Sequence, residues 1–111
     1  MASWIRAGAL LALAVCGSTG CGRSAPQPVT HTVTIEAVQF QPSTLRVRPG
    51  DTVVWINKDP FPHTVTAASG TPSSPDIGAS ERWQWVAEGS GDVAYVCKYH
   101  LTMKGTITVA P

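Results

Sequence analysis

The chain has 111 residues and a formal net charge of +1, which limits it to one small domain. It contains no run of like charges, so nothing in it favours nucleic acid or a polybasic contact with a membrane. When residues 1–20 are set aside, seven basic and seven acidic side chains remain, on a chain of about ninety residues that can bury one modest core. We expect a near-neutral, monomeric domain that binds no nucleic acid.

The first 20 residues have the pattern of an export signal. Residues 7–15 are apolar without interruption, but a membrane-spanning helix needs about 20 such residues, so a secretory signal is predicted. Residues 18–22 resemble the cleavage box of bacterial lipoproteins, which implies a lipid on Cys21 and a membrane anchor. The alternative is an ordinary signal peptide cut between Ala14 and Ala25, which leaves a soluble protein. Both readings predict an exported protein, periplasmic or otherwise extracytoplasmic.

Residues 21–31 are predicted to be a tether, and residues 32–111 the folded domain. The domain alternates apolar and polar residues in short runs rich in β-branched side chains, which is typical of strands, and no helical stripe is present. The predicted strands are Thr32–Glu36, Thr44–Val47, Thr52–Asn57, Thr64–Ala67, Arg82–Val86, Val93–Cys97 and Gly105–Val109, with a break at Gln39–Pro42. Such strands, with frequent turns, predict an all-β antiparallel sandwich or Greek-key barrel of about seven to eight strands.

The cysteines argue against a disulfide in the domain. Cys16 leaves with the signal, and Cys21 is lipidated or lies in the tether, so Cys97 stands alone in the fold. An unpaired thiol in an oxidising compartment is a liability unless something occupies it. A metal ion would occupy it.

Four side chains have the chemistry of a copper site. Cys97, His100 and Met103 follow one another at three-residue spacing, and His63 lies in the loop after an apolar strand. Soft sulfur ligands suit Cu(I) and imidazole suits Cu(II), so this set favours copper over harder metals. Each residue taken alone has an ordinary explanation: Cys97 as a buried thiol, His100 as a solvated loop residue and Met103 as part of the core. Taken together, the residues favour a bound copper ion. His31 has no partner at ligand spacing and is expected to be an exposed strand residue.

At these residues the chain resembles a known family. The matching segments are Thr52–Pro60, Pro62–Val65, Tyr95–His100 and Met103–Gly105, which are similar to the small blue copper proteins, the cupredoxins, in their plastocyanin and amicyanin branch. The resemblance implies that His63, Cys97 and His100 are strong copper ligands and that Met103 is a long axial one. It also implies that Asn57 ties the two ligand loops together. The two-residue gap between His100 and Met103 resembles the short amicyanin loop, without its usual prolines.

The resemblance implies a type 1 copper protein that passes single electrons between redox partners and is not an enzyme. His100 would be the electron portal, and Pro60, Phe61, Pro62 and Leu101 would surround it with an apolar patch suited to brief docking. Two alternatives remain open at this point. One is a copper chaperone or storage domain with the same ligands, and the other is an adhesion-type sandwich without metal.

Overall fold

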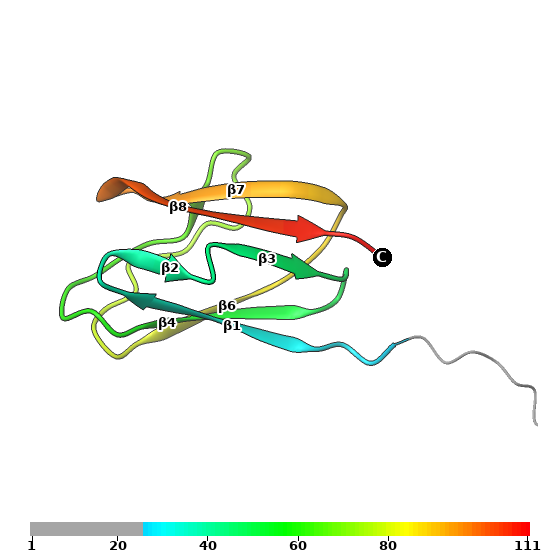
Figure 1. Cartoon of the computed structure of the whole chain (residues 1–111), viewed down its shortest axis with the longest axis horizontal. Coiled ribbons are helices and arrows are strands. Elements are labelled where there is room, and N and C mark those ends of the chain that lie inside the picture. Colours follow the sequence, from blue (N-terminus) through cyan, green and yellow to red (C-terminus); the bar gives the residue numbers. More distant parts are fainter. Residues whose placement is uncertain (1–25) are drawn as a thin grey trace, which may run out of the picture.

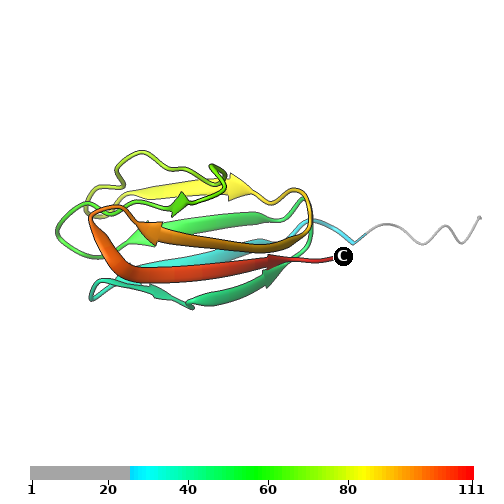
Figure 2. The same ribbon diagram turned by 90° about the horizontal axis from the view of Figure 1, so that it is seen from above.

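A computed structural model describes residues 26–111; the predicted export signal and Cys21 lie outside them. Two four-stranded sheets pack face to face, in the orders β2-β1-β4-β6 and β3-β8-β7-β5 (Figures 1 and 2). The strands are β1 Thr30–Glu36, β2 Gln39–Gln41, β3 Thr44–Val47, β4 Thr52–Asn57, β5 Thr66–Ala67, β6 Arg82–Val86, β7 Gly91–Cys97 and β8 His100–Val109. The predicted all-β sandwich is confirmed. Residues 26–111 contain no helix with the length and hydropathy of a membrane span.

The expectation of purely antiparallel sheets was wrong. Strand β1 pairs with β4 in parallel, and β3 pairs with β8 in parallel, while the other pairs are antiparallel. The chain crosses from one sheet to the other between β2 and β3, so strands distant in the sequence become neighbours. Turn patterns report only on hairpins between consecutive strands, and therefore do not reveal these parallel pairs.

Strands β1 and β7 each begin two residues earlier than predicted, and three other strands differ more strongly from the prediction. Gln39–Gln41 does not break the fold but forms β2, because Phe40 is buried between two exposed glutamines and pairs with Ile35. Strand β5 has only two residues, since the backbone of Val65 bonds to Ser74 in the following loop rather than to β7. Strand β8 begins at His100 rather than at Gly105, so β7 and β8 form one long hairpin.

The core between the sheets is centred on Trp55. This residue is fully buried in β4, a strand with three consecutive buried residues, as its apolar sequence predicted. Its indole N–H donates to the Tyr95 hydroxyl at 3.2 Å, and the two rings meet edge to face at 5.6 Å between centroids. Burial of the Tyr95 phenol raises its pKa to about 12. Trp83 also packs against Trp55, with ring centroids 5.6 Å apart, and is itself partly buried.

The two ends of the sandwich carry different loops. The loop that follows β4 and the β7–β8 turn lie together at the end opposite the C-terminus (Figures 1 and 2). The loop that carries His63 and the turn between Cys97 and His100 therefore share one end of the sandwich. At the other end His31 lies in strand β1, as expected, but it is half-buried rather than exposed, and its Nε2 lies 2.8 Å from Asp51 Oδ2. Asp51 follows the turn before β4, too far along the chain for a local pattern to reveal the pair.

Candidate metal centre

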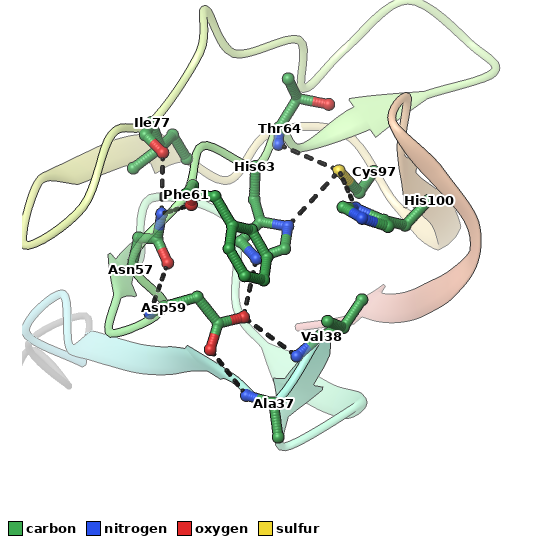
Figure 3. Close-up of polar contacts among 10 residues, drawn as sticks. All are labelled: Ala37, Val38, Asn57, Asp59, Phe61, His63, Thr64, Ile77, Cys97 and His100. Atoms are coloured by element: carbon green, nitrogen blue, oxygen red, sulfur yellow. Dashed lines mark hydrogen bonds and ion pairs between the residues drawn. The ribbon is translucent and has the colours of Figure 1, made fainter.

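One thiol and two imidazoles converge at the loop end of the sandwich. Cys97 is the last residue of β7, His100 is the first of β8, and His63 comes from the loop after β4. The Cys97 Sγ lies 3.7 Å from His63 Nδ1 and 3.8 Å from His100 Nδ1, and the three atoms all lie within 4.8 Å of one another. Figure 3 shows both rings turned toward the sulfur. The sequence-predicted thiol and histidines are thus brought together.

The three side chains differ in their access to solvent. His63 and Cys97 are fully buried, whereas His100 is half-buried at the surface. Within the described part of the chain, the Cys97 thiol forms no disulfide. Phe61 packs against both imidazoles, with ring centroids 5.1 Å from His63 and 6.0 Å from His100. The cluster is therefore shielded from water except where the ring of His100 reaches the surface.

His63 is held at both its backbone and its ring. Its backbone exchanges two hydrogen bonds with Ile77, and its Nε2 lies 2.7 Å from Asp59 Oδ2. An ionised carboxylate can only accept hydrogen bonds, so Nε2 must carry the ring proton. The lone pair of Nδ1 is then free and faces the Cys97 sulfur, as a metal ligand requires.

The Asp59 carboxyl is ionised despite its burial. Burial raises its pKa, but the hydrogen bonds from the Val38 amide, the His63 ring and the Ala37 amide together outweigh it. The pKa of Asp59 therefore lies below its ordinary 3.8. Sequence reasoning missed this residue. The available signal was an acidic residue four positions before a candidate ligand, but in a loop that spacing fixes no geometry.

Thr64 joins the two ligand loops. Its backbone N–H donates to Cys97 Sγ at 3.4 Å, and its hydroxyl accepts the Lys98 N–H at 3.0 Å. The residue is fully buried. The sequence placed Thr64 in the family-like segment Pro62–Val65, but nothing in it indicated that this threonine contacts the Cys97 loop.

Asn57 organises the His63 loop from within. It is fully buried and donates from its side-chain amide to the Phe61 and Ile77 carbonyls at 2.8 and 2.9 Å. Its side-chain oxygen accepts the Asp59 N–H at 2.9 Å. These bonds connect the loop after β4 to the segment before β6, whereas Thr64 makes the connection to Cys97. Met103 is buried in β8 three residues after His100, and its part as a fourth ligand stays a prediction.

An apolar surface surrounds the exposed edge of His100. Phe61, Tyr99 and Leu101 are 39%, 50% and 69% exposed, and a shallow hollow is lined by Phe61, Pro62, Tyr99 and His100. Lys98 lies next to this surface and forms an ion pair, because its Nζ lies 3.5 Å from an Asp76 carboxylate oxygen. The same carboxylate accepts the Tyr99 hydroxyl at 2.7 Å.

Comparison with known proteins identifies the family. The model of the copper-binding proteins of the plastocyanin/azurin family matches residues 27–110. The chain belongs to this family. It is 31% identical over 86 residues to a plastocyanin of Scenedesmus fuscus, covering 66% of this chain and 88% of that protein. It is 28% identical over 98 residues to amicyanin-alpha of Methylorubrum extorquens, covering 84% and 82%. A mutant amicyanin in its oxidized state superposes with a TM-score of 0.69 at 27% identity, covering 73% and 82%.

Family membership confirms the predicted cupredoxin fold and the copper cofactor. The donor atoms fit that metal. The buried Cys97 thiol and two imidazole nitrogens form a soft and intermediate ligand set, which copper prefers. Within residues 26–111 no carboxylate joins the cluster to favour a hard cation. The Asp59 hydrogen bond also leaves His63 Nδ1 in the form that a metal needs.

Proposed function

We propose that this protein is a type 1 copper electron carrier that moves single electrons between exported or membrane-bound redox proteins. The observation that carries the proposal is the convergence of the Cys97 thiol and two imidazole Nδ1 atoms in a sealed cluster. Only one of these three side chains reaches the surface. A site with this layout can exchange electrons while excluding substrates and water.

In this proposal His63, Cys97 and His100 would bind copper strongly, Met103 would contribute a weaker thioether ligand, and Asn57 supports the loop that presents His63. Bound copper supplies one-electron redox chemistry, because thiolate and imidazole ligands together suit both of its oxidation states. The chain supplies rigidity. Cys97 and His100 belong to paired strands, and His63 is fixed at its backbone and its ring. Ligands held in this way move little between oxidation states.

The apolar surface around His100 suits brief contact with redox partners. Electron-transfer complexes bury less than about 1,200 Å² and dissociate quickly, so a small patch without strong ion pairs is sufficient. Phe61 and Tyr99 offer such a patch beside the half-buried ring of His100, and Leu101 follows His100 as a further exposed apolar residue. We propose a monomer that performs no bond-making catalysis and binds no nucleic acid.

The N-terminal sequence extends the proposal to location. Residues 1–20 would direct export, a lipid on Cys21 would anchor the protein at an extracytoplasmic membrane face, and the residues from Cys21 to the start of β1 at Thr30 would act as a tether for the domain. Such a tether raises the effective concentration of the domain near membrane-bound partners. Mass spectrometry of the protein from a bacterial host tests the anchor, because a diacylglyceryl group on Cys21 has a defined mass.

The experiment that tests the function measures retention of copper and speed of electron exchange on the same sample. An electron carrier keeps its copper against a competing Cu(I) chelator, and its oxidised and reduced forms exchange electrons rapidly when mixed. A chaperone or storage domain would give up the metal readily and exchange electrons slowly. The Cys97→Ser variant serves as the control, because it lacks the thiolate on which rapid exchange depends.

A further inference from the structure

The Asp59 carboxylate accepts three hydrogen bonds from two separate parts of the chain. Its Oδ1 accepts the Ala37 N–H at 2.8 Å, and its Oδ2 accepts the Val38 N–H at 2.9 Å and the His63 ring at 2.7 Å. Only 7% of Asp59 is exposed. Figure 3 shows the carboxylate between the β1–β2 turn and the imidazole. The turn and the His63 ligand are therefore connected through a single side chain.

The turn that holds Asp59 is a strained one. Ala37 and Val38 have φ values of 53° and 58°, in the left-handed region that disfavours side chains with a Cβ and β-branched ones most of all. Glycine or asparagine would suit both positions better. The amides of this two-residue turn both point at the Asp59 carboxylate, which compensates for the conformation. The same two amides hold the Asp59 carboxylate in place.

We propose that Asp59 is a positioning residue of the metal centre, and this inference rests on the proposed copper site. It holds the His63 ring in one orientation and one tautomer, with the proton on Nε2 and the lone pair on Nδ1. Its negative charge, transmitted through the hydrogen bond, makes Nδ1 a stronger donor. A stronger, more negative donor set stabilises Cu(II) more than Cu(I), so Asp59 lowers the reduction potential.

The chain contains a matched control at the opposite end of the sandwich. Asp51 accepts the Val29 N–H on Oδ1, and the Arg48 N–H and the His31 ring on Oδ2, at 2.9, 3.0 and 2.8 Å. It is 4% exposed, much like Asp59. The two carboxylates therefore make the same three kinds of bond, but the imidazole bonded to Asp51 is not part of the thiol cluster.

The test compares Asp59→Asn with Asp51→Asn in the copper-loaded protein. An asparagine presents an amide N–H₂ where one carboxylate oxygen stood, so each variant loses at least one acceptor and the charge. We expect Asp59→Asn to lower Cu(II) affinity about tenfold or more. The affinity for Cu(I) should fall less. Each tenfold by which the loss of Cu(II) affinity exceeds the loss of Cu(I) affinity raises the one-electron reduction potential by about 59 mV. The copper hyperfine splitting in the EPR spectrum should also change. Asp51→Asn should leave potential and spectrum at their wild-type values.

Equal reduction potentials for the wild type and Asp59→Asn would overturn the inference. Equal shifts of the potential in Asp59→Asn and Asp51→Asn would also overturn it, because they would show a merely structural effect. Failure of the proposed function looks different, because the wild type itself would then lack a blue spectrum. A second measurement uses the wild-type protein alone, so it tests the inference even if the Asp59→Asn variant does not fold. In ¹⁵N NMR of the wild-type Cu(I) protein, His63 should carry a slowly exchanging proton on Nε2. Its absence would contradict the proposed hydrogen bond.

Discussion

Two aspartate–histidine pairs lie at opposite ends of this sandwich and are built in the same way. In each, a buried carboxylate accepts two backbone amides and one imidazole Nε2, through Asp51 to His31 and through Asp59 to His63. The difference lies in what faces the other side of the ring. His63 Nδ1 faces Cys97, whereas His31 is 23% exposed and belongs to no metal-ligand cluster in residues 26–111.

This comparison separates the scaffold from the site. A carboxylate–imidazole pair is a structural device that secures a loop or a strand end wherever it occurs. It becomes part of a metal centre only where the topology brings a thiol and a second imidazole to the free ring nitrogen. Here the β7–β8 hairpin does this at one end alone, since it presents Cys97 and His100 as facing residues.

The largest difference between the two ends should appear when each histidine is removed. His63→Ala should abolish the type 1 copper spectrum and lower the stability of the metal-free protein by about 2–3 kcal/mol, because a fully buried ring is lost. His31→Ala should keep the spectrum and cost about 1 kcal/mol. Absorption spectra of the copper-loaded variants and urea unfolding of the metal-free ones measure both effects. A normal spectrum in His63→Ala would contradict the assignment of this ligand.

The next largest effect is a loss of stability in the core between the two ends of the sandwich. A Cβ on Gly105 would lie 2.3 Å from Tyr95 Cζ, so Gly105→Ala must displace the phenol and its bond from Trp55. We expect a loss of about 3 kcal/mol, at the upper end of the cost of overpacking. Gly70→Ala is the control, because its Cβ meets nothing within 4 Å and only the left-handed backbone at φ +94° resists it. Thermal unfolding compares them, and equal losses would contradict the packing argument.

A smaller effect should appear in acid at the end without the thiol. Hydrogen bonds from the Val29 and Arg48 amides and from His31 lower the pKa of Asp51 from 3.8 to about 2. Because the folded pKa is the lower one, the ionised carboxylate stabilises the fold above about pH 4, and this contribution is lost as the pH falls toward about 2. In Asp51→Asn that part of the acid sensitivity should vanish.

Urea unfolding of the metal-free proteins across this range measures the effect. Wild-type stability should fall more steeply with decreasing pH than that of Asp51→Asn, while Asp59 remains unchanged in both proteins. Parallel curves would show that the hydrogen bonds to Asp51 do not hold its charged form in the fold.

The smallest effect is expected on the surface of the metal end. The Tyr99 hydroxyl lies 2.7 Å from both Asp76 carboxylate oxygens, but all of these groups are exposed. Tyr99→Phe should leave the unfolding midpoint nearly unchanged and the copper spectrum unchanged, because exposed hydrogen bonds compete with water. Chemical unfolding and absorption spectra test this. A changed spectrum would mean that this surface bond, rather than buried contacts, holds the short ligand loop in place.

Much of the fold and the ligand cluster could be predicted from the sequence. Alternation located most strands, since a half-buried strand must repeat every two residues, and the spacing of Cys97 and His100 put them in one hairpin. His63 could be placed because a buried strand before it and a matching family segment around it fixed its end of the sandwich. These features follow from local residue patterns or from resemblance to a known family, and both can be seen in a single sequence.

The remaining features depend on contacts between distant segments. The parallel pairs of β1 with β4 and β3 with β8 follow from crossings between sheets, which leave no local mark. Asp59 and Thr64 acquire their roles from the positions of Val38 and Cys97, which no spacing rule supplies. The left-handed Ala37–Val38 turn even contradicts its own residue types, because its stabilising partner lies about twenty residues away.

The central claim is that the Cys97 thiolate and the two Nδ1 atoms bind copper in a type 1 site, and the visible absorption and EPR spectra of the copper-loaded protein test it most directly. We expect an intense thiolate-to-copper band with a small copper hyperfine splitting in the wild type, and loss of that band in Cys97→Ser. A Cys97→Ser variant that kept the full band would contradict the claim. So would a wild type whose spectrum and melting temperature did not respond to stoichiometric copper.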